Sequence, residues 1–331
     1  MMSNRARLKT ALQGGFITIW IACIVLFVVG GIIAPSSLAR SSLLSMLPYA
    51  AILAVIAAGQ TLVAQQGGID LSVPGLVSLG AILVTKIPLD APQLVLPAIA
   101  AAIVAGAIGG ALNGLLVTLG RITPIVATIA VNALTLGFIQ WYSKGFPTPV
   151  AQFLGDLAVG EFLGLPIMAI SAVAFVALVH FALTSTVIGR RFEAVGANPA
   201  AAMAANIHVE GYVIAGYAGA GACYAIGGVL LAAYLKTPTV FVGEAYLLPS
   251  VAAVVLGGTA LTGGLGSVVA SAVAAVFLTQ LGQLVLTLGA PTSAQWVIQA
   301  VAIAIGMAWR EVRIGSLLTW LRGFAPARRT A

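Results

Sequence analysis

Charged residues are scarce in this sequence. Asp, Glu, Lys and Arg together make up 7% of its 331 residues, whereas a soluble domain of similar length carries about a quarter. With so few charges and a mean hydropathy of +1.12, the chain has too little polar surface to be covered by water. This composition excludes a soluble domain and predicts an integral membrane protein.

The residues that usually build catalytic and metal sites are also few. Cys23 and Cys223 both lie inside apolar runs, which indicates small packing residues rather than a disulfide framework or a metal site. His180 and His208 are far apart in the chain, and no pair of carboxylates shares a helical face. No lysine follows a glycine, as a phosphate-binding P-loop requires. The sequence therefore predicts no catalytic site, no metal site and no cofactor bound by this chain.

Long apolar runs, by contrast, occupy most of the chain, of which 61% is apolar. The runs are continuous over about 20 residues, the length of a membrane-spanning helix, and do not alternate as the strands of a barrel do. The predicted fold class is all-α, a polytopic transmembrane helical bundle with one or two broken or re-entrant segments, in a single domain over residues 1–331. Ten spans are expected, of which the third and eighth are short, near residues 14–34, 43–66, 72–87, 93–119, 123–142, 166–186, 211–235, 247–263, 267–288 and 293–309.

The first apolar run could be confused with a signal peptide. It extends over residues 16–34, which is longer than the usual apolar region of about 7–15 residues in a cleaved signal. We therefore expect an uncleaved first span, and cleavage near Ala39 is the alternative.

The basic residues indicate the orientation, because Lys and Arg are in excess in cytoplasmic loops. With the amino terminus inside, eleven basic residues fall on the cytoplasmic side, and both termini are predicted to be cytoplasmic. The net charge of +7 then favours contact with an anionic leaflet. Since no solvated basic domain is present, no nucleic acid is expected as a partner. The four basic residues predicted outside are Arg40, Lys86, Lys144 and Lys236.

The stretch "QQGGIDLSVPG", residues 65–75, interrupts two apolar runs. Asp70 or Ser72 can cap a helix that begins near residues 69–73, and Pro74 suits its first turn. Gly67 and Gly68 let the chain turn without a steric penalty. A capped re-entrant turn thus explains each residue. The alternative is that Asp70 lines a gate or a translocation path, as intramembrane ionisable groups often do, and the two interpretations are compatible.

The one substantial internal loop, residues 189–211, contains the pattern of a short helix. Asn198 is a good N-cap, Pro199 suits the first helical position, and alanines follow until Asn206. Such a helix can dock in a groove of another protein or rest on lipid. Its alanine-rich face lacks the Trp, Phe or Lys that bind an interface, so the residues alone leave both interpretations open.

Small and amide residues within the spans predict close helix contacts. Gly106, Gly110 and Gly114 recur at four-residue intervals and should lie on one helix face against a neighbour. Asn113, beside them, either faces a polar path or bonds to a neighbouring helix. The same two interpretations apply to the other amides near membrane depth, for which packing is the default: Gln60, Gln65, Gln66, Asn132 and Gln140.

Three motifs in order, "GGIDLSV", "FEAVGANPAAA" and "AAVVLGGTALTGGLGS", resemble the permease subunits of bacterial ATP-binding-cassette (ABC) sugar importers, in the branch typified by the ribose, xylose and galactofuranose permeases. The resemblance covers essentially the whole chain but is not specific for the sugar. It implies a multi-pass protein of the bacterial inner membrane that translocates a monosaccharide. It also implies three kinds of partner: a periplasmic sugar-binding protein, a second permease copy, identical or paralogous, and a separate ABC ATPase subunit that binds ATP and Mg.

The resemblance implies that the internal loop docks on the ATPase. The candidate residues for ATPase coupling are Arg190, Arg191, Glu193, Gly196, Asn198, Pro199, Ala200 and Ala201. The candidate residues for a gate or translocation path, which the resemblance does not assign, are Gly67, Gly68, Asp70, Ser72, Asn113, Gly257, Gly258, Gly263 and Gly264. The chain departs from the family at Pro74, where glycine is common, and at residues 247–250, where the family often has an acidic pair whose role does not transfer.

Two other functions are compatible with the residues. A secondary transporter also uses broken helices, but ion coupling needs ionisable groups at depth, and the candidates are Asp70 and Glu244. A passive channel would leave the docking loop without a role.

The charge distribution gives a topology test. Cysteines introduced at Gly145 and Lys236 should react with an impermeant thiol reagent added outside, whereas cysteines at Ala197 and Ala327 should not. A reversed pattern at any two of these sites would contradict the ten-span arrangement.

Overall fold

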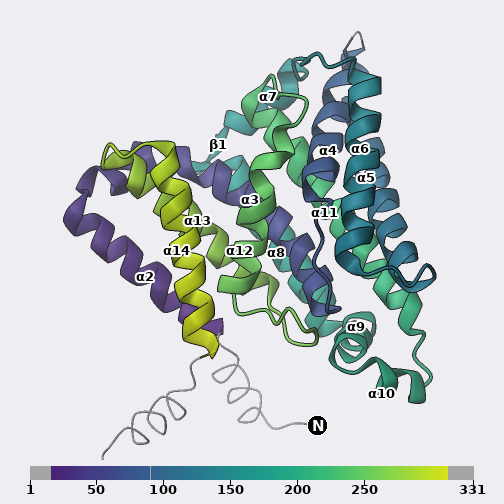
Figure 1. Ribbon diagram of the computed structural model, residues 1–331. Helices are drawn as coiled ribbons and strands as arrows, with labels where there is room; N and C mark the ends of the chain where they lie inside the picture. Colours follow the sequence, from purple (N-terminus) through teal and green to yellow (C-terminus); the bar gives the residue numbers. More distant parts are fainter. Residues whose placement is uncertain (1–15, 90, 312–331) are drawn as a thin grey trace, which may run out of the picture.

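The protein is described here by a computed structural model, which covers residues 16–89 and 91–311 (Figure 1). Over these residues the chain is almost entirely helical, and its one sheet is an antiparallel pair of two-residue strands, β1 (Glu161–Phe162) and β2 (Leu165–Pro166). The α-helices are α2 (Phe16–Ile33), α3 (Arg40–Gln65), α4 (Val73–Lys86), α5 (Val95–Thr118), α6 (Pro124–Ser143), α7 (Gln152–Val159), α8 (Ile167–Ser185), α9 (Val187–Ala197), α10 (Pro199–Ala204), α11 (Val209–Leu235), α12 (Leu247–Leu256), α13 (Val268–Thr287) and α14 (Thr292–Glu311). Short 3₁₀ helices precede α3, α5 and α12: η1 (Pro35–Leu38), η2 (Pro92–Leu94) and η3 (Val242–Tyr246).

The predicted polytopic helical bundle is confirmed. Seven described helices are long and apolar enough to cross a membrane: α2, α3, α5 with η2, α6, α8, α11 and α13. The predicted third and eighth spans correspond to shorter apolar helices, α4 and η3–α12. Residues 257–263, which the eighth span was expected to include, lie outside α12 in turns. The full count of ten spans stays a prediction.

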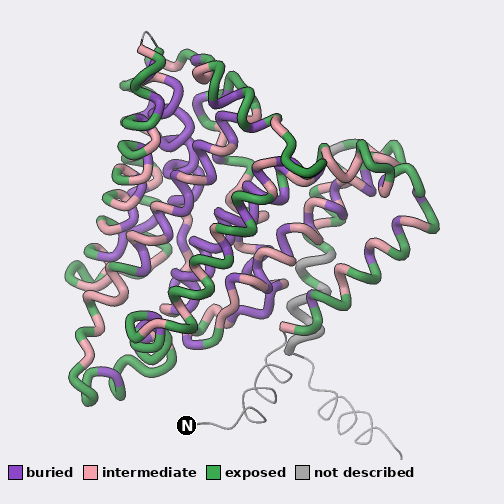
Figure 2. The backbone as a smooth tube through the Cα atoms, turned by 180° about the vertical axis from the view of Figure 1, so that it is seen from behind, coloured by how far each residue is buried: buried purple, intermediate pink, exposed green. Residues whose placement is uncertain are grey.

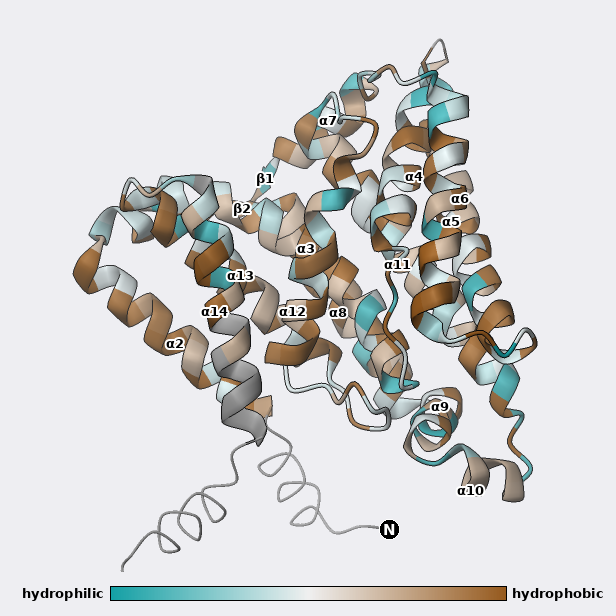
Figure 3. Ribbon diagram, viewed as in Figure 1, coloured by the Kyte–Doolittle hydropathy of each residue, from teal (hydrophilic) through white to brown (hydrophobic). Residues whose placement is uncertain are grey.

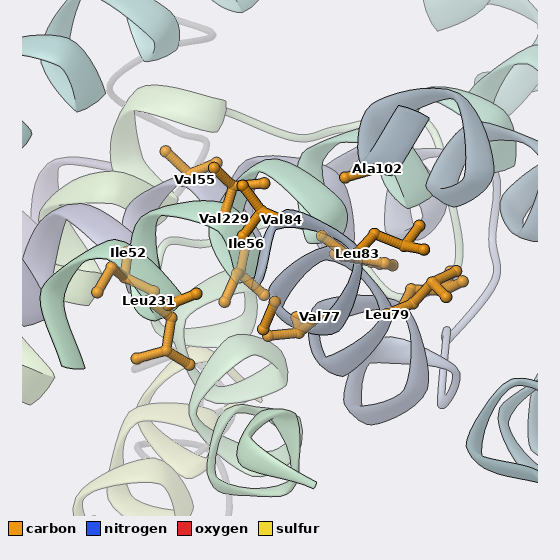
Figure 4. Close-up of a cluster of buried hydrophobic side chains, with 14 of the residues drawn as sticks. Ile52, Val55, Ile56, Val77, Leu79, Leu83, Val84, Ala102, Val229 and Leu231 are labelled. Atoms are coloured by element: carbon orange, nitrogen blue, oxygen red, sulfur yellow. The ribbon is translucent and has the colours of Figure 1, made fainter. Parts of the chain in front are cut away.

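Helix α4 lies at the centre of the larger core. Every residue from Val73 to Thr85 is buried, since α4 is enclosed by α5, α6, α11 and η3. Figure 4 shows part of this core, where Val77 of α4 lies among Ile56 of α3 and Val229 of α11. A helix that is apolar on all sides is stable only in such an enclosed position. Residues 73–85 carry no charge and form a helix of this kind.

Glycines allow the central helices to touch backbone to backbone. A Cβ added at Gly110 of α5 would collide with the carbonyl of Tyr217 in α11, and one at Gly106 with the carbonyl of Gly221. Gly114 meets Ile214 of the same helix. The predicted contact face on α5 is therefore confirmed, and its partner is α11.

Apolar side chains cover the outside of the bundle. Examples are Ile24 (63% exposed), Leu96 (73%), Trp141 (74%) and Leu178 (64%). Figure 2 shows that buried residues concentrate in the middle of the bundle while α2 is mostly exposed, and Figure 3 shows that α2 is hydrophobic. Apolar exposure on this scale is unusual in a soluble monomer and is expected where lipid is the solvent.

The basic loop residues separate to two ends of the bundle. One end of the bundle carries α7, the ends of α4, α6 and α11, and the start of α3 (Figure 1). The four basic residues that were predicted outside lie at these helix ends. The α9–α10 segment and the α5–α6 turn with Arg121 lie at the opposite end. The orientation of the termini stays a prediction, because several of the basic residues that support it lie outside the described residues: Arg5, Arg7, Lys9, Arg313, Arg322, Arg328 and Arg329.

The α5–α11 contact predicts a stability difference between two glycines. Gly110→Ala places a methyl group against the Tyr217 carbonyl, and overpacking of this kind costs about 1–3 kcal/mol. Gly137→Ala is the control, because its Cβ would meet nothing within 4 Å on α6. Thermal unfolding of the detergent-purified protein should show a lower midpoint for Gly110→Ala alone, and equal midpoints would contradict the packing argument.

Candidate functional site

The α9–α10 segment is built by two side-chain caps. The Thr186 hydroxyl accepts a hydrogen bond from the Gly189 N–H (3.0 Å) at the start of α9. The Asn198 side chain accepts one from the Ala201 N–H (3.0 Å), and Pro199 occupies the first turn of α10. The helix ends before Asn206, which has φ +58°. The helix expected after Asn198 is therefore confirmed.

The outer surface of α10 consists mainly of small side chains. Ala200 and Ala201 of α10 are exposed, and Met203 between the alanines is 60% exposed. Ala202 is the exception, since it is buried and faces the protein. On α9, the expected coupling residues Arg190, Arg191 and Glu193 are exposed as well.

The inner side of α9 is anchored in the bundle. Phe192 is buried with Leu62 of α3 and Cys223 of α11. The Phe192 carbonyl accepts a hydrogen bond from the Gln66 amide at the end of α3 (3.0 Å). These contacts attach α9 to the end of α3.

Three chain-distant segments meet where α9 ends, and we call this contact the glycine junction (Gln65, Gly67, Gly196, Gly263 and Gly264). The Gln65 carbonyl accepts a hydrogen bond from the Gly264 N–H (2.9 Å). A Cβ at Gly196 would collide with that same carbonyl, and a Cβ at Gly263 would collide with the Gly196 carbonyl. The structure thus brings together one candidate coupling residue and three of the candidate path residues.

Backbone conformation explains why glycine occurs in the junction. Gly67, Gly263 and Gly264 have φ values of +75°, +95° and +84°, which L side chains rarely adopt. Gly68 does not have a positive φ. Glycine is required there for a steric reason, because a Cβ would collide with the Tyr217 hydroxyl. The packing role expected for the Gln65 side chain agrees with its hydrogen bond to the Gly266 carbonyl (3.1 Å). The sequence did not predict the role of the Gln65 carbonyl, because its partner Gly264 is far along the chain and leaves no local signal.

Asp70 belongs to a fully buried polar cluster. Its Oδ1 accepts hydrogen bonds from the Ser72 N–H (2.8 Å) and the Ser72 hydroxyl (2.6 Å). The Asn113 amide of α5 donates to the same hydroxyl (2.8 Å). Asp70, Ser72 and Asn113 each have 0% exposure. Asn113 therefore bonds to a neighbouring segment, and none of the three lines an open path in this conformation.

The cap expected for α4 is corrected in its detail. Ser72 is the N-cap residue but makes no side-chain capping bond, and Asp70 bonds to Ser72 rather than to the first turn of the helix. The Gly75 N–H of α4 is instead bonded by the Asn132 side chain of α6 (2.8 Å), and Thr128 of α6 accepts from the Leu71 N–H (3.0 Å). The start of α4 is thus held mainly from α6.

The remaining candidate path residues lie at the end of α12. Gly257 packs against the backbone of Ala270 and Ser271 in α13, and Gly258 has φ +85°. These contacts close the turn between α12 and α13 and do not involve the Asp70 cluster.

The buried cluster makes a graded prediction at Asp70. Asp70→Asn keeps an oxygen acceptor for Ser72 and should be mild. Asp70→Leu leaves the Ser72 donors unpaired, which costs about 1–3 kcal/mol and should lower the yield of folded protein. If Asn impairs transport as severely as Leu while the protein level stays normal, the carboxylate charge itself is required and the gate interpretation is supported.

Known proteins match this chain over nearly its whole length. The sequence model of the family described as branched-chain amino acid transport system / permease component matches residues 42–308. The ribose import permease protein RbsC of Bacillus subtilis (strain 168) is 36% identical over 286 residues, which cover 86% of this chain and 88% of that protein. RbsC of Escherichia coli (strain K12) is 33% identical, covering 87% and 91%.

A third relative has a different solute in its name. The galactofuranose transporter permease protein YtfT of Escherichia coli (strain K12) is 30% identical, covering 84% of this chain and 82% of that protein. No solved structure matches the chain significantly. The extent of these matches and the helical bundle lead to the same conclusion: the chain belongs to the permease components of ABC importers, in the family that includes the ribose and galactofuranose permeases.

Proposed function

We propose that this chain is the transmembrane permease subunit of an importer that moves a monosaccharide across the bacterial inner membrane, driven by ATP hydrolysis in a separate ATPase subunit. The observation that carries the proposal is the exposed small-residue surface of α10, which is joined through α9 to the glycine junction. In this assembly a periplasmic binding protein delivers the sugar, and a second permease, identical or paralogous, completes the membrane part.

The surface of α10 fits a protein partner better than a lipid surface. Helices that rest on lipid present large apolar or basic side chains, whereas the exposed residues of α10 are mainly Ala200, Ala201 and Ala204, with Met203 beside them. Small side chains allow a partner's backbone to approach closely, and Met is common at adaptable binding surfaces. Arg190, Arg191 and Glu193 on α9 supply charged groups around this contact.

The glycine junction gives the docked segment a mechanical connection to the bundle. Gly196 at the end of α9 touches the Gln65 carbonyl, which also holds Gly264. Because backbone meets backbone without intervening side chains, a displacement of α9 cannot be absorbed by rotamer changes. In the proposed mechanism, closure of the ATPase therefore moves the end of α3 and the α12–α13 turn together.

The names of the relatives support a sugar as the solute. The relatives are described as ribose and galactofuranose permeases, and both solutes are neutral and rich in hydroxyls. In the proposed assembly ATP and Mg are bound by the partner ATPase, and this chain contributes no catalytic residue, cofactor or metal.

The rival mechanisms have weaker support. Ion-coupled secondary transport requires ionisable groups that solute or ions can reach. Asp70 is the one fully buried carboxylate among the described residues, and Glu244, the other candidate, is exposed in η3 and does not belong to the Asp70 cluster. A passive channel would leave the exposed α10 surface unexplained.

The first test is energetic. The complete transporter in vesicles should take up the sugar only when ATP is present on the side of the membrane where the ATPase lies. The purified permease alone should take up none. ATP-driven uptake by this chain alone would contradict the proposed function, and uptake by the complex without ATP would favour a channel or a secondary transporter.

The second test addresses docking through Ala201. Ala201→Trp and Ala201→Arg should reduce ATPase co-purification and uptake by about fivefold or more while the permease stays folded, because overpacking a tight contact costs about 1–3 kcal/mol. Ala130→Trp is a matched control, since Ala130 is exposed on the membrane-facing side of α6. Normal co-purification and uptake in both Ala201 variants would reject docking through this face.

A further inference from the structure

A cavity lies at the end of the molecule opposite α10. It has a volume of about 520 Å³, within the range of about 300–1,000 Å³ typical of small-molecule sites. Its wall is formed by the first half of α3, the end of α11, the η3–α12 segment, the second half of α13 and the first half of α14. The polar side chains in that wall include Tyr49, Tyr234, Tyr246, Thr279, Gln283 and Gln299.

The position of the cavity follows from the direction of its helices. α13 begins at Val268, directly after its N-cap Ser267 and close to the glycine junction, and lines the cavity only from Leu278 onward. α3 lines it between Ser45 and Leu53 and reaches the junction at Gln65. The cavity is therefore in the half of the bundle that is predicted to face outward, where a delivered solute arrives.

The wall combines apolar side chains, such as Leu53 and Leu278, with polar side chains that carry no charge. Within the described part of the chain, the lining contains tyrosines, glutamines, Ser45 and Thr279, with no Asp, Glu, Lys, Arg or His. An unpaired charge would lose its hydration in such a site without compensation. Hydroxyl groups, in contrast, can exchange hydrogen bonds with amides and phenols, which both donate and accept.

The tyrosines add a flat aromatic surface. Tyr49 of α3 and Tyr234 of α11 pack edge to face, with ring centroids 5.1 Å apart and planes at 83°. The electron-rich face of such a ring attracts the weakly positive C–H groups of a sugar ring. An uncharged ligand with hydroxyls on its edge and C–H groups on its face matches both features of this wall.

This polar lining is not general to the cavities of the bundle. The cavity between α2, α3, α8 and α13, with a volume of about 380 Å³, is lined by apolar side chains such as Trp20, Ala50 and Val273. Lipid chains can fill that space. Tyrosines and glutamines placed together in a membrane protein call for a different occupant, because polar side chains facing hydrocarbon would be unsatisfied.

We propose that the cavity bounded by α3, α12, α13 and α14 is the outer solute chamber of this chain and binds a neutral polyhydroxylated ring of monosaccharide size. This inference rests on the proposed function and assigns it a site. It differs from the path expected from the sequence, since Asp70, Ser72 and Asn113 do not line this chamber.

The first experiment fills the chamber in the complete transporter. Ala245 also lines the chamber and is more exposed than Thr279. Thr279→Trp and Ala245→Trp should each lower ATP-dependent uptake of radiolabelled D-ribose, D-xylose or D-galactose at least tenfold. Assembly and basal ATP hydrolysis should be unchanged. Val297→Trp is the control, because Val297 of α14 is 63% exposed and does not line the chamber.

The outcomes separate the chamber from the function. Wild-type uptake in both filled variants that assemble overturns the chamber while the importer function stands. If the wild-type complex moves none of the three sugars with ATP, the monosaccharide function is rejected, and the second experiment then decides on the chamber by itself.

The second experiment needs no transport. In a background with Cys23→Ala and Cys223→Ala, Thr279→Cys should react from outside with a glucose-coupled thiosulfonate in preference to an anionic sulfonatoethyl thiosulfonate. The ratio of the two labelling rates at Thr279→Cys should be at least tenfold higher than the ratio at Gly145→Cys on the exposed turn. Val297→Cys, on the outer surface of α14, should stay unlabelled. Absence of labelling at Thr279→Cys, or an equal preference at both sites, rejects an outward chamber for neutral solutes.

Discussion

The structure depends on one constraint, which is that a backbone broken inside a membrane protein must find its hydrogen bonds within the protein. The chain breaks between α3 and α4, and the freed groups are bonded by elements far along the sequence. The Leu71 and Gly75 N–H groups donate to α6 side chains, and the Gln65 carbonyl accepts from Gly264. These bonds hold α6 and the α12–α13 turn against the break, so the arrangement of the surrounding helices follows from it.

Glycine allows the second feature, close contact between backbones. At the glycine junction it brings α9, the end of α3 and the α12–α13 turn together, and at the α5–α11 interface it brings two spanning helices together. Such contacts have little freedom to relax, because neither side has a side chain that can change rotamer. We expect a bundle built in this way to transmit a displacement rather than absorb it, which is the mechanical property that the proposed function requires.

Local signals in the sequence were sufficient for much of this architecture. The spans follow from apolar runs, α10 from the Asn198–Pro199 start, and the α5 contact face from Gly106, Gly110 and Gly114. The sequence could not show that Asn132 and Thr128 hold the start of α4, because these partners are 57 positions away from the groups they bond. The outer chamber was also missed, because its tyrosines and glutamines come from separate helices and none forms a motif.

Two helices connect the proposed docking end with the proposed chamber. α3 passes from Tyr49 in the chamber wall to Gln65 in the junction, and α13 passes from Val268, near the junction, to Gln283 in the wall. A helix of about 20 residues spans roughly 30 Å, so each of them reaches across most of a bilayer as a single element. On the proposed function, a tilt imposed on the ends of α3 and α13 at the junction changes the separation of their other ends, where Tyr49 and Gln283 bound the solute. In this proposal the chamber is opened or closed from the ATPase side through α3 and α13.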